Sequence, residues 1–84
     1  MAPSDRTAMI ETMVSGLAER LKQQPDDVEG WLKLIRSYVV LGRADEAAEA
    51  ARDALQGVQT PEARGRVEAL IADLHLTPQG AQTQ

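Results

Sequence analysis

The 84-residue sequence contains no cysteine and no phenylalanine, and its only aromatic residues are Trp31 and Tyr38. Without cysteine the chain can form no disulfide and no thiolate metal site, has no cysteine nucleophile, and cannot carry the Cys-x-x-Cys-His pattern of covalent haem attachment. Alanine and leucine dominate the apolar residues, and residues that favour strands are scarce. The composition therefore predicts an all-α domain.

Long apolar runs and concentrations of positive charge are also absent. No stretch approaches the roughly 18 to 20 apolar residues of a membrane-spanning helix. Residues 1–9 do not join a basic region to an apolar one, as a targeting segment does. The 13 acidic residues outnumber the nine lysines and arginines, giving a net charge of −4 with the basic residues scattered. We therefore expect a soluble chain with no nucleic-acid partner.

A chain of this length has room for one small domain. We expect this domain to span residues 5–76, after a disordered N-terminus at residues 1–4. The closing segment "TPQGAQTQ" has no periodicity and no bulky apolar residue that could offset the entropy of ordering it. Residues 77–84 are therefore expected to be a disordered tail.

Apolar periodicity predicts a first helix from about Asp5 to Gln23, capped by Ser4 or Asp5 and stopped by Pro25. Its stripe at three- and four-residue spacing consists of Ile10, Met13, Val14, Leu17, Ala18 and Leu21. Met9 and Met13 are expected to fill core space, although a methionine-rich face could also adapt to a partner.

Capping signals define a second and a third helix. Asp26 as N-cap, with Glu29 three residues later, predicts the start of the second helix, and Gly42 ends it as the C′ residue. The third helix is expected from about Ala44 to Leu55. Alanines line its inner side, which lets a neighbouring helix approach closely.

A fourth helix begins where Thr60 can act as N-cap and Pro61 takes the first helical position. The apolar stripe that follows consists of Val67, Leu70, Ile71 and Leu74. The sequence thus predicts four helices joined by short connections.

The second and third helices together resemble the 34-residue helix-turn-helix unit of tetratricopeptide repeats. The characteristic positions of that unit are held by Trp31, Leu34, Tyr38, Gly42, Ala47, Ala54 and Leu55. Pro25 stands where the proline that closes a preceding repeat belongs. Two positions depart from the pattern, because Ile35 replaces a small residue and Ala51 replaces an aromatic one. The exchange conserves bulk across the two helices.

In this interpretation the first helix is the second half of one repeat, and the fourth is the first half of another. The expected fold is all-α, with antiparallel helical hairpins arranged as a half repeat, one full repeat and a half repeat in a right-handed coil. A single repeat cannot bury its apolar face alone, so each flanking helix covers the central pair.

The second helix carries more apolar residues than one core face needs. At about 100° per residue, Val28, Trp31, Leu34, Ile35, Tyr38 and Leu41 share the core face. Leu32, Val39 and Val40 fall outside it. Leu32 and Val39 could widen the core against the fourth helix or against a second copy of the chain; alternatively, these residues form the floor of a peptide groove in which Arg36 pairs with a ligand carboxylate. The expected groove residues are Glu29, Leu32, Arg36, Val39, Val40, Glu68, Ala72 and His75.

Other kinds of site have little support in the sequence. The acidic pairs Asp26/Asp27 and Asp45/Glu46 lie at helix starts, where capping explains them better than catalysis does. His75 is the only histidine, and no set of metal ligands converges with it. Because no nucleophile, base and orienting residue form a set, we expect no enzyme, no metal and no cofactor.

The lead helix "MIETMVSGLAERLKQQP", the joint "DDVEGWLKL" and the segment "RSYVVLGRADEA" resemble the repeat region of c-type cytochrome biogenesis components of the CcmI/CycH type. The resemblance covers about residues 5–76. It implies a non-catalytic periplasmic domain of a membrane-anchored bacterial protein, with the membrane spans and the other half of the first repeat upstream. It also implies a chaperone-like role, in which the domain captures the C-terminal helix of apocytochrome c and passes it to the haem ligation machinery.

Two other functions remain open at this stage. One is a generic tetratricopeptide adaptor for another peptide; the type that grips acidic tails needs lysine and asparagine where Glu29 and Leu32 stand. The other is self-association into a homo-oligomer through the outer faces of the first and fourth helices.

Overall fold

The computed structural model describes residues 3–76, and these residues form four α-helices and no strand. The helices are α1 (Pro3–Gln23), α2 (Val28–Val40), α3 (Ala44–Gly57) and α4 (Pro61–Asp73). The predicted all-helical class is confirmed. The expected tail at residues 77–84 and the first two residues lie outside the described part of the chain.

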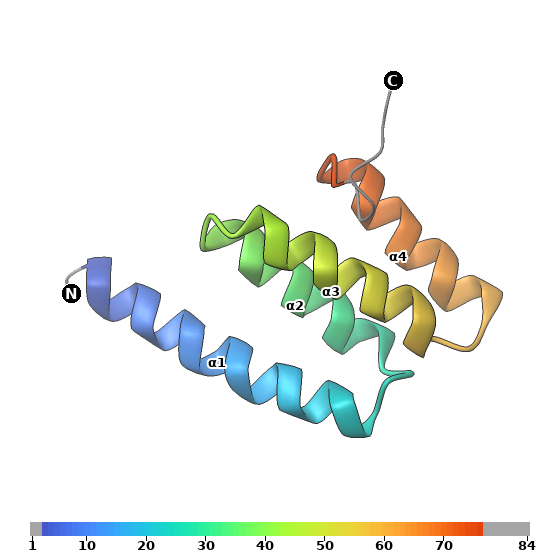
Figure 1. The fold of residues 1–84 in the computed structure, drawn as a ribbon, viewed down its shortest axis with the longest axis horizontal. Helices are drawn as coiled ribbons and strands as arrows, with labels where there is room; N and C mark the ends of the chain where they lie inside the picture. The colour runs from blue at the N-terminus through green and yellow to red at the C-terminus, as the bar shows by residue number, and fades with distance from the viewer. Residues whose placement is uncertain (1–2, 77–84) are drawn as a thin grey trace.

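The hairpin of α2 and α3 forms the centre of the molecule, and α1 and α4 flank it on opposite sides (Figure 1). α1 packs against α2, whereas α4 packs against both α2 and α3. Each flanking helix thereby covers part of the central hairpin. α2 has three helical neighbours, and its remaining side faces solvent.

The start of α1 differs from the prediction. The helix begins at Pro3, so Ser4 and Asp5 lie in its first turn and are not N-caps. A proline is favourable there because the first N–H groups of a helix have no partner within the helix. Asp5 in the first turn still benefits from the helix dipole.

The N-cap of α2 is Asp27 and not Asp26. The Oδ1 of Asp27 accepts a hydrogen bond from the backbone N–H of Gly30 over 3.2 Å. The turn after Pro25 extends one residue further than expected, because the N–H of Asp27 bonds back to the carbonyl of Gln24 over 3.1 Å. Glu29 falls in the first turn of α2 and forms no capping box.

The end of α2 is a Schellman motif, as the glycine predicted. The N–H of Gly42 donates to the carbonyl of Val39 and the N–H of Arg43 donates to the carbonyl of Tyr38, each over 2.9 Å. Gly42 adopts the left-handed conformation with φ of +77°. A residue with a Cβ atom would be strained at this position.

Both ends of α4 are also capped. The Oγ1 of Thr60 accepts a hydrogen bond from the N–H of Ala63 over 3.1 Å, which confirms Thr60 as N-cap. At the other end, the N–H groups of His75 and Leu76 donate to the carbonyls of Ala72 and Ile71. This is a second Schellman motif, but its left-handed residue is His75, with φ of 57°.

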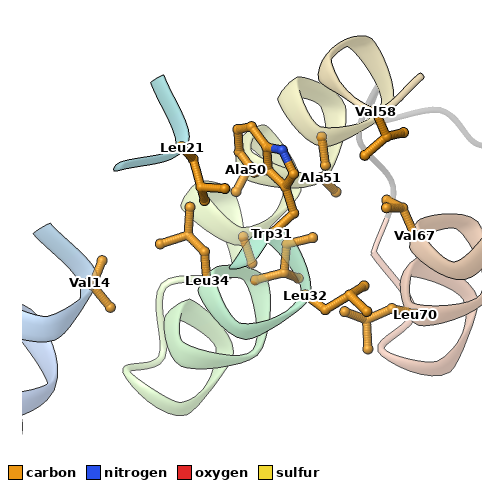
Figure 2. Packing of buried hydrophobic residues seen from close by; sticks show 13 residues of the cluster. Val14, Leu21, Trp31, Leu32, Leu34, Ala50, Ala51, Val58, Val67 and Leu70 are labelled. Atoms are coloured by element: carbon orange, nitrogen blue, oxygen red, sulfur yellow. The ribbon is translucent and has the colours of Figure 1, made fainter. Parts of the chain in front are cut away.

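The core lies where α2 meets the other three helices (Figure 2). Its buried apolar residues are Val14, Leu21, Trp31, Leu32, Leu34, Ile35, Ala47, Ala50, Ala51, Ala54, Val58, Val67 and Leu70. Ile35 and Ala51 are both fully buried. The two residues that depart from the repeat pattern, one large and one small, thus both lie in the core.

The expectation that Met9 and Met13 fill core space is wrong. Met9 is 62% exposed and Met13 is 44% exposed. Val14 and Leu21, on the neighbouring arc of α1, are the residues of this helix that enter the core. The methionines occupy the edge of the stripe, and no described helix covers that edge.

Candidate peptide-binding surface

One face of α2 remains open after α1, α3 and α4 have packed around it. Glu29, Lys33, Arg36 and Val40 project from this face, and all four are exposed. Val40 is the most exposed large apolar residue of the described chain, at 70%. These side chains lie at positions three or four apart, so they form one continuous stripe along the helix. We call this stripe the open face of α2.

Leu32 does not belong to the open face. It is buried, with 6% of its surface exposed, and Figure 2 shows it beside Leu70 of α4. Of the two interpretations of Leu32, the one in which it widens the core against the fourth helix is therefore the one that the structure shows. Val39 lies at the border, with 36% of its surface exposed.

The candidate groove residues of α4 are exposed but already make local contacts. Glu68 lies 3.5 Å from the guanidinium of Arg64, one turn earlier on the same helix. The backbone carbonyl of Ala72 accepts a hydrogen bond from the backbone N–H of His75. His75 itself lies beyond the end of α4. The cleft that Arg36 lines does not include Glu68, Ala72 or His75 among its lining residues.

The cavity that Arg36 does line lies between α1 and α2. It is a cleft of about 270 Å³. Its lining residues are Ile10, Met13, Glu29, Lys33, Arg36, Ser37 and Val40. The expected groove residues do not include Ile10 and Met13 of α1, nor Lys33 and Ser37 of α2. Helical spacing could have indicated Lys33, which stands between Glu29 and Arg36 on one arc.

Some charged residues around this α1–α2 cleft have an ion-pair partner and others have none. The carboxylate of Glu29 lies 2.7 Å from the guanidinium of Arg66, so an ion pair connects α2 to α4. Lys33 and Arg36 form no ion pair with any residue from 3 to 76. The cleft therefore presents two uncompensated positive charges on a chain whose net charge is −4.

On the opposite side of α2, Trp31 is buried and Tyr38 is half-buried against the core. The indole Nε1 of Trp31 donates a hydrogen bond to the carbonyl of Pro25 over 2.7 Å. Burial raises the pKa of the Tyr38 phenol, and the nearby carboxylate of Glu46 adds to the increase, whereas Arg43 opposes it. Arg43 in turn pairs with Glu11 of α1 and with Glu46.

Residues 3–76 provide neither a cluster of metal ligands nor a membrane-spanning helix. No group of three or more histidine, aspartate or glutamate side chains in this range could hold a metal ion. None of its helices is both long enough and apolar enough to cross a membrane.

Comparisons with known proteins place the sequence near two bacterial proteins. No protein-family model matches the chain, and no solved structure matches it. A protein of Rhizobium meliloti is 46% identical over 66 residues, which are 79% of this chain and 17% of that protein. A protein of Bradyrhizobium diazoefficiens is 55% identical over 58 residues, which are 69% of this chain and 16% of that protein. The chain thus corresponds to about one sixth of two longer relatives, and each of these relatives is named "Cytochrome c-type biogenesis protein CycH".

Proposed function

We propose that the chain is a non-catalytic, helix-binding module of c-type cytochrome biogenesis. In this function it captures the C-terminal helix of apocytochrome c and presents it for haem attachment by the ligation machinery. The chain is 46% and 55% identical to two proteins named for cytochrome c-type biogenesis, and these identities support a role in that process. The open face of α2 supports the binding role.

The architecture that we propose is the tetratricopeptide one, with α1 as a half repeat, α2 and α3 as a full repeat and α4 as a half repeat in a right-handed coil. The residues at the characteristic positions support it. Trp31, Leu34, Ala47 and Ala54 are buried, Tyr38 and Leu55 are half-buried, and Gly42 has positive φ. Pro25 accepts the indole hydrogen bond at the joint between α1 and α2. In this architecture the first helices of successive repeats line the concave surface.

The open face of α2 is the observation that carries the proposed function. Val40 is 70% exposed, and Arg36 has no ion-pair partner among the described residues. An amphipathic helix that ends in a free carboxylate complements both features, because apolar side chains can cover Val40 and the carboxylate can pair with Arg36. Val39, Glu68, Ala72 and His75 are proposed to border the groove, with Glu29 beside Arg36. Leu32 supports the groove from the core.

The relatives are about six times longer than the segment that they share with this chain. We propose that the parent protein is a membrane-anchored bacterial protein and that this segment lies in the periplasm. A single exposed helix face is a small platform. Binding by the 84-residue chain alone is therefore expected to be weak.

A peptide titration tests the proposed function. A fluorescent peptide with the sequence of an apocytochrome c C-terminal helix is titrated with the chain, and binding is followed by fluorescence anisotropy. Arg36→Ala should weaken binding by about tenfold, because one charge-assisted pair contributes about 1.4 kcal/mol or more. Arg52→Ala serves as the matched control, since Arg52 is also exposed and lies on α3.

Two results would contradict the proposal. The first is the absence of binding at any soluble concentration of the chain. The second is binding that Arg36→Ala and Arg52→Ala weaken equally, which would indicate a general charge effect. In either case, an adaptor for a different peptide becomes the better interpretation of the fold.

A further inference from the structure

We infer that the groove between α1 and α3 is a second binding surface, and that it accepts a basic, arginine-containing segment of a protein partner. We call this surface the α1–α3 groove. It lies on the side of α2 that carries Trp31 and Tyr38, opposite the open face of α2. The inference therefore does not depend on the proposed function, and a chain with two opposite surfaces can hold two partners at once.

The α1–α3 groove exists because, in the described chain, α1 and α3 each pack against α2 but not against each other. The hollow between them has a volume of about 140 Å³. Trp31 and Leu34 of α2 line it together with Ala50 of α3. All three are buried, and Figure 2 shows them close together. The groove therefore has an apolar floor.

The helices that form this groove are α1, α2 and α3, and α4 contributes no residue to it. In the proposed repeat architecture α1 and α3 are the second helices of successive repeats, whereas the first helices line the opposite, concave surface. A first helix in front of α1 would lie on that opposite surface, as α4 does beside the central hairpin. The α1–α3 groove thus stays open between successive repeats and is not the place of another repeat helix.

The border of the groove on α3 is acidic. Glu46, Glu49 and Asp53 all line the groove, and their three- and four-residue spacing places them along one stripe of the helix. Glu46 lies 3.6 Å from the guanidinium of Arg43. Glu49 and Asp53 form no ion pair with any residue from 3 to 76. Two uncompensated carboxylates, one helical turn apart, therefore border the apolar floor.

Lys22 lines the groove from the side of α1. Its Nζ lies 3.5 Å from the carboxylate of Glu19 on the same helix, and no ion pair connects it to α3. A cation from a partner would therefore reach Glu49 and Asp53 without breaking an ion pair. The same cation would be repelled by Lys22, which gives the groove a basic edge opposite its acidic one.

Tyr38 provides a polar contact inside the groove. Its phenol lines the hollow and has no hydrogen-bond partner among residues 3–76. Burial raises the pKa of this phenol, and the charges of Glu46 and Glu49 add to the increase. The negative potential of α3 thus extends over the ring. A guanidinium placed here can donate to the phenol oxygen and to a carboxylate.

Charge and spacing specify the partner. Carboxylates repel nucleic acids and anionic lipid surfaces. Arginine side chains fit, because their methylene groups can cover the apolar floor while their guanidinium groups pair with carboxylates. The helical rise places Glu49 and Asp53 about 6 Å apart along α3. Alternate residues of an extended segment are about 6.6 Å apart, so two arginines at alternate positions match the two carboxylates.

A pair of synthetic peptides tests the inference. The first is a labelled, tyrosine-free peptide of about seven residues with arginine at two alternate positions. In the second, citrulline replaces both arginines and keeps their shape without their charge. In anisotropy titrations at low ionic strength, the 84-residue chain should bind the arginine peptide at least about tenfold more tightly. Added salt should weaken this binding, because the paired charges are exposed to solvent.

Variants locate the site on the chain. Glu49→Gln combined with Asp53→Asn should weaken binding of the arginine peptide by about tenfold. Glu62→Gln combined with Asp73→Asn removes the same charge from exposed positions of α4, and should change the affinity by less than about twofold. Lys22→Gln should strengthen binding by about threefold, because it removes the like charge across the groove. All of these positions are exposed, so circular dichroism should show unchanged helix content.

Three results would overturn the inference. Equal affinities for the arginine and citrulline peptides would show that no cation is recognised. Equal weakening by the two double variants would indicate a general charge effect. Displacement of the arginine peptide by an equal concentration of spermidine would identify a small polyamine as the occupant.

The apocytochrome c peptide separates this inference from the proposed function. Its affinity should not change in the Glu49→Gln, Asp53→Asn variant, since the open face of α2 lies on the other side of the helix. Loss of that affinity in this variant would contradict the existence of two separate surfaces. If the apocytochrome c peptide binds and the arginine peptide does not, the proposed function stands and the inference is wrong. If only the arginine peptide binds, with the expected variant effects, the inference stands and the proposed function is wrong.

Discussion

The indole Nε1 of Trp31 lies 2.7 Å from the carbonyl oxygen of Pro25 and donates a hydrogen bond to it. The same proline contacts the last turn of α3, because a Cβ atom on Gly57 would lie only 2.5 Å from the Pro25 oxygen. The connection between α1 and α2 is therefore held from two sides, by a side chain of α2 and by the backbone of α3. This joint holds Pro25, which follows α1, close to Trp31 of α2 and to the last turn of α3.

A methyl group at Gly57 tests how tightly the joint is packed. Gly57→Ala should lower the free energy of unfolding by about 1 to 3 kcal/mol, since the backbone of Pro25 must move to admit the Cβ atom. Urea denaturation followed by circular dichroism measures the change. Gly65→Ala is the matched control, because nothing lies within 4 Å of a Cβ atom at that helical position.

The control should change in the opposite direction, with Gly65→Ala raising the free energy of unfolding by about 0.5 to 1 kcal/mol. An equal effect of the two substitutions would show that the approach of Gly57 to Pro25 does not constrain the fold.

The two Schellman motifs predict a second pair of opposite effects. Gly42 has φ of +77°, and His75 has φ of 57° at the equivalent position after α4. His75→Gly should therefore raise the free energy of unfolding by up to about 1 kcal/mol, whereas Gly42→Ala should lower it by about 1 kcal/mol. Thermal unfolding of the two variants beside the unsubstituted chain provides the measurement.

His75→Gly also tests whether His75 contacts a ligand. If the variant is more stable but binds the apocytochrome c peptide less well, His75 belongs to the groove. Unchanged affinity would remove it from the proposed set. A lower free energy of unfolding for His75→Gly would contradict the conclusion that the left-handed backbone conformation of His75 is strained.

Local capping chemistry made the helix boundaries largely predictable from the sequence. Gly42 and Thr60 act as expected, because each needs only its own backbone and a few neighbours. Local capping chemistry could not decide whether Asp26 or Asp27 is the N-cap of α2. Either side chain can cap a helix, and the choice depends on the hydrogen bond from the N–H of Asp27 to the carbonyl of Gln24.

Burial on α1 and α2 was less predictable. The stripe of α1 includes Met13 by spacing, yet whether the edge of a stripe is covered depends on which helices are present to cover it. Leu32 shows the opposite case, since it lies outside the core arc of α2 but is buried where α4 packs. The cleft joins residues from two helices, and helical periodicity alone does not specify how those helices are placed side by side.

Alanine substitutions of Leu32 and Val40 test whether Leu32 belongs to the core and Val40 to the open face of α2. Leu32→Ala should lower the free energy of unfolding by about 2 to 5 kcal/mol, because it leaves a cavity between α2 and α4. Val40→Ala should change it by no more than about 0.5 kcal/mol, since the side chain is 70% exposed. Similar losses for the two variants in urea denaturation would contradict the assignment of Leu32 to the core and Val40 to the open face.

Tyr38 predicts how stability changes at high pH. Burial, assisted by Glu46, raises the pKa of its phenol above the ordinary value near 10, so the folded state favours the neutral form. Above about pH 10 the unfolded chain releases this proton more readily than the folded chain does, and the free energy of unfolding falls as the pH rises. This contribution is complete below that pH and is lost as the pH rises toward the folded pKa.

Because Tyr38 is the only tyrosine, absorbance of the tyrosinate reports its pKa directly. Glu46→Gln should lower that pKa, since it removes a nearby negative charge and leaves Arg43 without one of its carboxylate partners. Tyr38→Phe should lose less stability than the unsubstituted chain between neutral pH and about pH 11, because lysines and arginines titrate alike in both proteins. A tyrosinate transition at the ordinary pKa, or identical pH profiles for Tyr38→Phe and the unsubstituted chain, would show that the phenol is not desolvated by its position between α2 and α3.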